Sequence, residues 1–229
     1  MCGRYVVAKT ADQLWDDYDI DTMGEDMPAP SWNIKPTQLV PVVVESAAGT
    51  DTVQRRLEAA RWSLIPPWVA DGKPKFSTFN ARSEDAATKA SWKASVKSKR
   101  CLVPADGYYE WVTRGTTKTP HYIDGVDKLT FAGLYSWWRA SDHDPWMLTA
   151  TILTMATVPE LADVHDRTPV TLPAAAWDTW LDPTIVGDQS LVDWAVAEAR
   201  PVASQLTHYE VAPLKGNGAE LIQPANARA

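Results

Sequence analysis

The stretch Leu39-Val40-Pro41-Val42-Val43-Val44 is a continuous apolar run dominated by valine. A short run of this kind, bounded by polar residues, is typical of a strand that is buried on both faces. Residues 100–103, 129–135 and 146–154 have the same character. These four segments predict buried strands at the centre of the fold.

Helical patterns lie between and after these strands. Thr10 is a capping-type residue, and it is followed by Leu14, Trp15 and Tyr18 at helical spacing, which predicts a helix over residues 10–18. Residues 82–96, 174–181 and 190–199 are also predicted helices. They do not alternate regularly with the strands, so a doubly wound parallel sheet is not favoured. We expect an α+β fold, a single domain around a mainly antiparallel, barrel-like sheet with flanking helices.

Composition sets the class of protein. The chain has 229 residues, of which 45% are hydrophobic and 22% charged, values typical of a globular protein with one core. We expect a domain over residues 1–215 and a flexible Gly/Asn/Ala-rich tail over residues 216–229. No apolar run approaches the length of a membrane span and the N-terminus has no signal-peptide pattern, so we expect a cytoplasmic monomer with no membrane association.

Cysteine and histidine are too few for several kinds of site. The two cysteines, Cys2 and Cys101, do not suggest a disulfide framework, and the four histidines lack the spacing of a zinc site. Cys101 lies in an apolar run and is expected to be a small buried side chain. We therefore expect no metal and no cofactor.

Charge is unevenly distributed along the chain. The net charge of −7 argues against a nucleic-acid partner, because phosphate binding requires local positive charge. Residues 10–34 contain seven acidic residues and no Lys or Arg, whereas residues 61–118 contain eleven Lys plus Arg against five acidic residues. The middle of the chain can therefore supply a basic surface.

Cys2 offers unusual chemistry because it follows the initiator Met1. Removal of Met1 would leave a free α-amine beside the thiol, with ordinary pKa values of about 8 and about 8.5. Such an aminothiol can condense with an aldehyde to an imine, and the thiol can then close a five-membered thiazolidine. From its position alone, Cys2 would be interpreted as an inert terminal residue, and only the surrounding motifs change that interpretation.

Five motifs extend this argument beyond Cys2. In order along the chain they are Cys2-Gly3-Arg4-Tyr5, Arg61-Trp62-Ser63-Leu64-Ile65-Pro66-Pro67-Trp68, Phe79-Asn80-Ala81-Arg82-Ser83-Glu84, Val103-Pro104-Ala105-Asp106-Gly107-Tyr108-Tyr109-Glu110-Trp111 and His165-Asp166-Arg167-Thr168-Pro169-Val170. Together they resemble the SOS-response-associated peptidase family, which includes bacterial and human abasic-site processing proteins. The resemblance runs from Cys2 to about Leu214.

The resemblance implies an enzyme that binds single-stranded DNA and crosslinks to the ring-opened aldehyde of an abasic site through a thiazolidine. The crosslink would shield the lesion during the SOS response, on nucleoid DNA, with possible lyase activity. In the family an Asn, a Glu and a His line the pocket beside the cysteine, and the matching residues are Asn80, Glu110 and His165.

The same resemblance implies a DNA-binding surface. Family arginines that bind phosphates match Arg4, Arg82 and Arg167, and an aromatic residue where bases stack matches Trp68. Arginine suits phosphate because its guanidinium presents a planar fork of donors. The rigid Pro66-Pro67 pair leads into Trp68, whose exposed face would let a base stack.

Residue chemistry is consistent with the implied catalytic roles. Glu110 stands between two aromatic residues, where a raised pKa would let it move protons to and from the amine. His165 can exchange protons near neutral pH and help to open the sugar ring. Asn80 is uncharged and suits positioning by hydrogen bonds. A solvent-facing Glu, a structural His and a turn-capping Asn are the ordinary alternatives for single residues of these types.

Two departures from the family pattern lie beside these positions, namely Thr168 where Met is common and Asp85 where Thr is common. Two other functions stay open. One is a thiol autopeptidase that uses Cys2 with Glu110 and His165, and the other is a noncatalytic single-stranded-DNA binding module. Peptide cleavage in trans would favour the first, and DNA affinity that survives loss of Cys2 without any adduct in the intact protein would favour the second.

Overall fold

Five strands close into a ring at the centre of the protein, whose computed structural model describes residues 2–47 and 52–225. Neighbouring strands pair in the order β5-β4-β7-β10-β11, all antiparallel, and β5 pairs in parallel with β11 to close the ring. The ring strands are β4 (Leu39–Ser46), β5 (Gln54–Trp62), β7 (Arg100–Pro104), β10 (Thr130–Trp138) and β11 (Met147–Ala156). The expected α+β fold around a mainly antiparallel, barrel-like sheet is confirmed.

The four apolar runs of the sequence lie in this ring. Four of the ring strands, β4, β7, β10 and β11, are buried almost throughout, whereas most residues of β5 are only partly buried. Both faces of these four strands are therefore covered, one by the ring interior and one by helices and loops. Gly133 shows how tightly the strands pack, because a Cβ there would lie 2.8 Å from the Cys101 Sγ and 3.0 Å from the Thr151 carbonyl oxygen. The expected strand over residues 146–154 is wrong at its start, because Trp146 precedes β11 and is 56% exposed.

Three short strands attach to the ring. β2 (Thr22–Met23) pairs in parallel with β5, β6 (Asn80–Arg82) pairs in parallel with β11, and β12 (Arg167–Pro169) pairs with β11 in the antiparallel sense. Two strands that carry sequence motifs are therefore held against β11.

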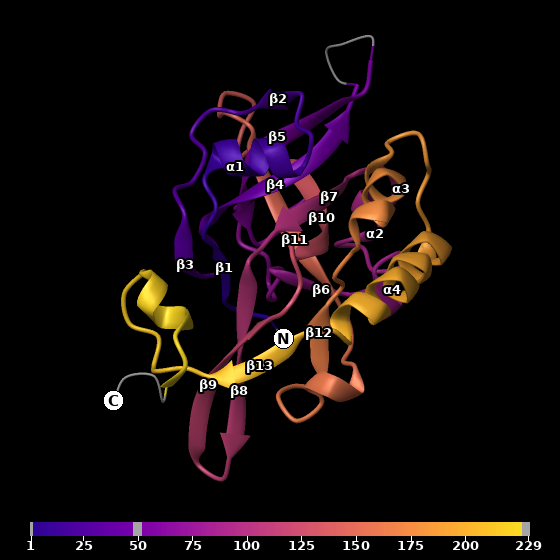
Figure 1. The fold of residues 1–229 in the computed structure, drawn as a ribbon. Helices are drawn as coiled ribbons and strands as arrows, with labels where there is room; N and C mark the ends of the chain where they lie inside the picture. Colours follow the sequence, from indigo (N-terminus) through magenta and orange to yellow (C-terminus); the bar gives the residue numbers. More distant parts are fainter. Residues whose placement is uncertain (1, 48–51, 226–229) are drawn as a thin grey trace.

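A second, antiparallel sheet has five strands in the order β13-β9-β8-β1-β3. Its members are β1 (Tyr5–Val7), β3 (Ser31–Ile34), β8 (Gly107–Arg114), β9 (Thr117–Asp124) and β13 (Thr207–Glu210). Figure 1 shows the β8–β9 hairpin extending away from the ring, with β13 beside β9. The first strand of the chain is thus held between β3 and β8.

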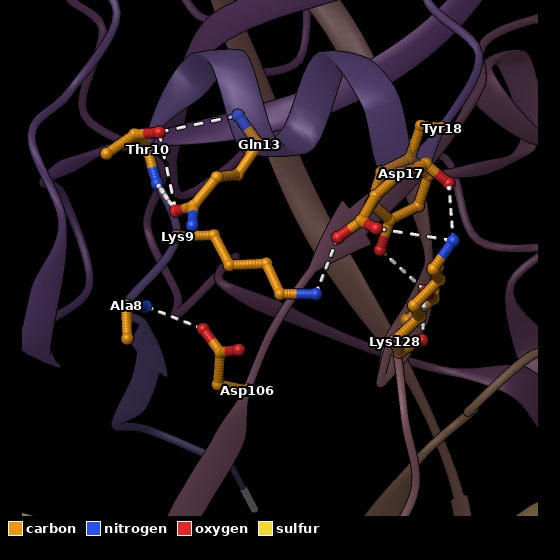
Figure 2. Close-up of polar contacts among 9 residues, drawn as sticks. Ala8, Lys9, Thr10, Gln13, Asp17, Tyr18, Asp106 and Lys128 are labelled. Carbon is orange, nitrogen blue, oxygen red and sulfur yellow. Dashed lines mark hydrogen bonds and ion pairs between the residues drawn. The ribbon is translucent and has the colours of Figure 1, made fainter.

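The expected helix over residues 10–18 is confirmed as α1 (Ala11–Asp17). The Thr10 side chain accepts from the Gln13 backbone N–H, and the Gln13 side chain accepts from the Thr10 backbone N–H, which forms a capping box. Figure 2 shows this box and the ion pairs of Asp17 with Lys9, at 2.5 Å, and with Lys128, at 3.2 Å. These contacts fix α1 to the loop that precedes β10.

The remaining helices are η1 (Ser83–Asp85), α2 (Lys93–Ser98), η2 (Pro159–Leu161), η3 (Ala174–Ala176), α3 (Trp177–Leu181), α4 (Gln189–Ala203) and η4 (Ala219–Ile222). In Figure 1, α3 and α4 lie to the right of the ring and α1 to its left. The helix expected over residues 190–199 lies within α4, and that over residues 174–181 is divided into η3 and α3.

A single helix over residues 82–96 is wrong. Pairing of Arg82 with Thr154 draws the beginning of this segment into β6, so that only η1 and α2 are helical. Between them the Thr88 hydroxyl donates to the Asp85 carbonyl, a side-chain contact that competes with a continuous helix.

The described part of the expected tail packs on the second sheet. The Asn217 side chain accepts from the Ser31 hydroxyl and from the Trp32 backbone N–H, both at 2.8 Å, and Leu221 of η4 is buried. Residues 226–229 of the tail, like Met1, lie outside the described residues. Within residues 2–47 and 52–225, no helix has the length and apolarity that crossing a membrane requires.

Candidate active site

Cys2 is buried at the junction of the two sheets, with 1% of its surface exposed. Its carbonyl oxygen accepts a hydrogen bond of 2.6 Å from the Asn80 Nδ2, across 78 residues of chain. Its thiol lies 3.8 Å from the Arg4 carbonyl oxygen, to which it can donate a weak hydrogen bond. The residue proposed as the nucleophile is therefore held in place by the backbone and by Asn80.

Asn80 owes its position to β6. The parallel register sets Asn80 beside Ile152 of β11, so the closed ring fixes its backbone. Its side chain is 9% exposed, and the Oδ1 accepts no hydrogen bond from any residue within the described ranges. A buried acceptor of this kind is costly unless a polar group reaches it, which makes the Oδ1 a candidate contact for an amine or a sugar hydroxyl.

Glu110 reaches the same region from β8. Tyr5 of β1 lies opposite Tyr108, and the Tyr109 backbone N–H donates to the Arg4 carbonyl at 2.8 Å, so the same register brings Gly3 opposite Glu110. Glu110 is 4% exposed, and this burial raises its pKa, while the charge of His165 opposes the rise.

The thiol and the carboxyl influence each other. Burial raises the pKa of the Cys2 thiol, and the negative charge of Glu110 raises it further. The thiol is therefore protonated near neutral pH, and a base has to accept its proton before sulfur attacks. The effect of Glu110 on the thiol shows that the carboxyl belongs to the electrostatic surroundings of Cys2.

His165 lies between η2 and β12, two residues before the first residue of β12. Its Nδ1 accepts from the Arg167 backbone N–H at 3.0 Å, so in the neutral ring the proton resides on Nε2. The same Nδ1 lies 2.8 Å from the Asp166 Oδ1. Both contacts are made by Nδ1, and they fix the orientation of the imidazole ring.

Tyr108 and Thr168 complete the buried surroundings and were not assigned roles from the sequence. The Tyr108 hydroxyl and the Thr168 Oγ1 are 2.9 Å apart, and both residues are 1% exposed. Charge on Cys2 or Glu110 raises the pKa of Tyr108, in addition to the larger effect of burial. Thr168, one of the two departures from the family pattern, thus supplies a polar partner that Met could not.

The three expected phosphate-binding arginines have different environments. Arg82 is exposed, whereas the Arg4 Nη1 donates to the Asn33 Oδ1 at 2.6 Å and its guanidinium lies 5.8 Å from the Trp111 ring centre. Arg167 is mostly buried and forms two bonds to the Glu84 carboxylate, of 2.5 and 2.9 Å.

The Arg167–Glu84 pair links the Asn80 and His165 motifs. Glu84 follows β6, Arg167 begins β12, and the Arg167 Nη2 also donates to the Thr154 carbonyl of β11, which lies between them. Arg167 therefore connects three segments of the site, an arrangement that sequence reasoning missed.

Comparison of the sequence with known families identifies the family to which these motifs belong. A sequence model of the SOS response associated peptidase (SRAP) family matches residues 1–217. The chain belongs to the SRAP family.

Several named relatives match most of the chain, two of them nearly all of it. The Bacillus subtilis "Abasic site processing protein YoaM" is 34% identical over 99% of this chain and 99% of its own length. The Bacillus subtilis protein YoqW is 33% identical over 97% of this chain and 99% of its own. The "Abasic site processing protein HMCES" of Xenopus tropicalis is 32% identical over 73% of this chain and 57% of its own length.

Solved structures show the same fold. A protein from Bacteroides thetaiotaomicron superimposes with a TM-score of 0.81 at 22% identity, over 98% of this chain and 100% of its own. A phage-related protein from Bordetella bronchiseptica has a TM-score of 0.70 at 26% identity, over 93% of this chain and 95% of its own.

In this SRAP chain two adjoining clefts lead outward from Asn80. We call the first the inner cleft, about 380 Å³ in volume and lined by Phe76, Ser77, Asn80, Arg82, Lys89 and Trp92. We call the second the Trp68 cleft, about 580 Å³ in volume, and Phe76 lines it as well. Trp68 and Phe76 are each 58% exposed.

Phe76 was not identified from the sequence as a site residue. Its position in Lys73-Pro74-Lys75-Phe76 was a signal, because an exposed aromatic residue beside lysines can lie near phosphate-binding groups. No cluster of three or more His, Cys, Asp or Glu side chains suited to a metal ion occurs within the ranges that the structure describes.

Proposed function

We propose that this SRAP protein processes abasic sites by forming a covalent thiazolidine between Cys2 and the aldehyde of the ring-opened sugar in single-stranded DNA. The observation that carries the proposal is the burial of Cys2 against Asn80, with Glu110 in electrostatic contact. The names of the YoaM, YoqW and HMCES relatives support the choice of abasic DNA as substrate.

The reaction begins only after Met1 has been removed, because the Cys2 nitrogen is otherwise part of a peptide bond. In the closed sugar a proton leaves the C1′ hydroxyl, the bond from C1′ to the ring oxygen breaks, and that oxygen gains a proton. His165 suits this exchange, because an imidazole ring can both donate and accept a proton and its Nδ1 contacts hold the ring in a fixed orientation.

The amine then adds to the aldehyde carbon, and the resulting carbinolamine loses water to become an imine. Glu110 first accepts the proton of the ammonium group and then returns it to the departing hydroxyl. Finally the sulfur adds to the imine carbon, and the thiol proton passes to the nitrogen. The balance is one aldehyde and one aminothiol giving one thiazolidine and one water.

Burial, positioning and proximity each assist a step of this reaction. A carboxyl with a raised pKa exchanges protons with an amine more readily than an exposed one, because the two pKa values are closer. The Asn80 Oδ1 can orient the new amine, and ring closure has the high effective concentration of an intramolecular reaction.

A thiol peptidase is the second candidate, and the environment of the thiol disfavours it. Such an enzyme needs a thiolate activated by a neighbouring base, with a lowered pKa. In this protein burial raises the pKa of the Cys2 thiol, and the thiol lies against the Arg4 carbonyl. A noncatalytic DNA-binding module would leave the buried Cys2, Asn80 and Glu110 arrangement without a role.

The test combines intact mass with an adduct assay. The purified protein should have the mass expected without Met1, and it should form a heat-stable, gel-shifted adduct with a single strand that contains an abasic site. The same strand with an intact base is the matched control and should give no adduct. Peptide cleavage in trans without any DNA adduct would establish the peptidase function instead.

A further inference from the structure

A third cleft lies on the far side of the loop that carries Trp68. We call it the Trp146 cleft, about 660 Å³ in volume, and its lining includes Pro67, Ala70, Lys99, Trp137, Arg139 and Trp146. It adjoins the Trp68 cleft, because Ala70 lines both, and the Trp68 cleft in turn shares Phe76 with the inner cleft. A continuous surface therefore leads from Asn80 to Trp146.

This surface collects the exposed aromatic side chains of the described part of the chain. Four Phe, Tyr or Trp residues there are exposed, and all four line these clefts, namely Trp68 (58%), Phe76 (58%), Trp137 (40%) and Trp146 (56%). We call these four residues the aromatic strip. Large aromatic side chains are normally buried, so their alignment along one surface requires a binding explanation.

Positive charge follows the aromatic strip although the whole chain carries −7. The inner cleft is lined by Arg82 and Lys89 and by no acidic residue among those described. The Trp68 cleft is lined by Lys73 and Lys75 against Asp71, and the Trp146 cleft by Lys99 and Arg139 against Asp142. Each cleft thus has an excess of positive charge.

Local contacts hold the Trp146 cleft in a fixed position. The Arg139 guanidinium lies 4.5 Å from the ring centre of Trp146, and its Nη1 donates to the Asp142 carbonyl at 3.2 Å. The Trp138 Nε1 donates to the Val69 carbonyl at 2.7 Å. Gly72, with a φ of +66°, packs so closely on the same indole that a Cβ would lie 2.9 Å from it. The Trp68 loop is therefore fastened to the end of β10.

We propose that the Trp146 cleft binds the single strand that flanks the lesion, as a continuation of the surface that begins at Asn80. This inference rests on the proposed function for the choice of DNA. Clefts that hold both aromatic side chains and cations suit a strand of bases and phosphates, because bases of any sequence stack on aromatic rings and phosphates pair with Lys and Arg. A peptide lacks this regular repeat of planar rings and negative charges.

The test measures how affinity depends on strand length. Intact, fluorescein-labelled single strands are extended on the 5′ or on the 3′ side from about 4 to about 16 nucleotides, the range of sites on single-strand binding proteins. Anisotropy gives the affinity of the protein and of Trp146→Ala for each strand. We expect extension on one side to strengthen binding, and Trp146→Ala to remove about fivefold or more of that gain, the scale of one lost base stack.

Matched variants separate stacking from folding. Trp146→Tyr retains an aromatic face and should retain the increase in affinity that strand extension gives. Arg139→Gln removes a cation and should reduce this increase at low salt. Val186→Ala alters a side chain that is 77% exposed and lines neither the Trp68 cleft nor the Trp146 cleft, so it should behave as wild type. If Trp146→Ala and Arg139→Gln both show the full wild-type gain, the cleft does not bind DNA.

A parallel assay distinguishes this failure from failure of the proposed function. Adduct formation with a short abasic strand depends on Cys2 and does not require the Trp146 cleft. An adduct without a length-dependent gain would overturn only the inference about the cleft. A length-dependent gain that depends on Trp146, in the absence of any adduct, would overturn the thiazolidine chemistry and leave a DNA-binding surface.

Discussion

The pocket at Cys2 and the aromatic strip are built from opposite kinds of surface. Cys2 and Glu110 are 1% and 4% exposed, and burial raises the pKa of both groups. Trp68 and Trp146 are 58% and 56% exposed, in clefts with excess positive charge. In the proposed function, burial tunes proton transfer, whereas exposure and charge give affinity for a strand. Covalent chemistry and DNA affinity should therefore be separable by mutation.

The largest effect is expected for Cys2→Ala, which should abolish the heat-stable adduct while leaving non-covalent affinity for single-stranded DNA within about a few-fold. Sulfur closes the ring, but phosphate contacts supply most of the affinity. Gel electrophoresis after heating measures the first property, and anisotropy the second. An adduct of wild-type yield and heat resistance would eliminate the thiazolidine, because an amine alone leaves a hydrolysable imine.

Glu110→Gln should slow adduct formation by about 10²-fold, the usual scale for losing a general acid–base group. In the wild type the rate should rise as pH increases through the raised pKa of Glu110, since the carboxylate is the form that accepts the amine proton. This rise should occur above the ordinary carboxyl pKa of about 4.3 and should be absent in Glu110→Gln. Single-turnover rates across pH provide the measurement, and equal rates for the two proteins would remove Glu110 from the mechanism.

His165→Ala should have a smaller and differently directed effect. Reversal has to return a proton to the sugar oxygen while the imine is hydrolysed, so the variant should lengthen the adduct lifetime more than it slows formation. Formation and release can be timed separately on one abasic oligonucleotide, with Asp166→Asn as the matched control for the charge beside the ring. Faster release from His165→Ala than from wild type would show that the role is assigned wrongly.

The smallest effect is expected for the arginines, which test how DNA affinity depends on phosphate contacts. If Arg4, Arg82 and Arg167 each neutralise a phosphate, affinity should fall with salt with a log–log slope of about −2. Arg82 is exposed, so Arg82→Gln should flatten the slope by about 0.7.

The Arg167 guanidinium is paired with the Glu84 carboxylate, so Glu84→Gln should strengthen DNA binding by releasing the Arg167 guanidinium from this ion pair. Affinity that does not change with salt would exclude the basic surface as a phosphate contact.

Sequence reasoning succeeded where the signal is local or is carried by motifs. Apolar runs predicted the strands of the ring, and the Thr10 capping pattern predicted α1. The motifs identified Cys2 and Asn80 as site residues. In the structure these two residues are in contact, with 2.6 Å between the Cys2 carbonyl oxygen and the Asn80 Nδ2. The role of each site residue stays a prediction.

Features that depend on distant segments were missed. The helix expected over residues 82–96 was overruled by pairing with β11, and the Arg167–Glu84 bond joins residues 83 positions apart. Trp146 read as the start of a buried strand, yet it lies outside β11 and is exposed. The apolar character of a residue does not show whether it lies in the turn before a strand or in the strand itself.

The parallel pairing of β5 with β11 has a consequence for when the pocket around Cys2 can form during synthesis. β5 ends at Trp62 and β11 begins at Met147, so the ring closes only when regions far apart along the chain meet. Contacts of this kind form slowly, because the entropy of a long loop is lost before they stabilise the fold. The ribosome releases Cys2 first and β11 and His165 much later, at about 5–20 residues per second. A nascent chain therefore carries Cys2 for seconds before the pocket around it can form, and the contact between Cys2 and Asn80 is acquired late.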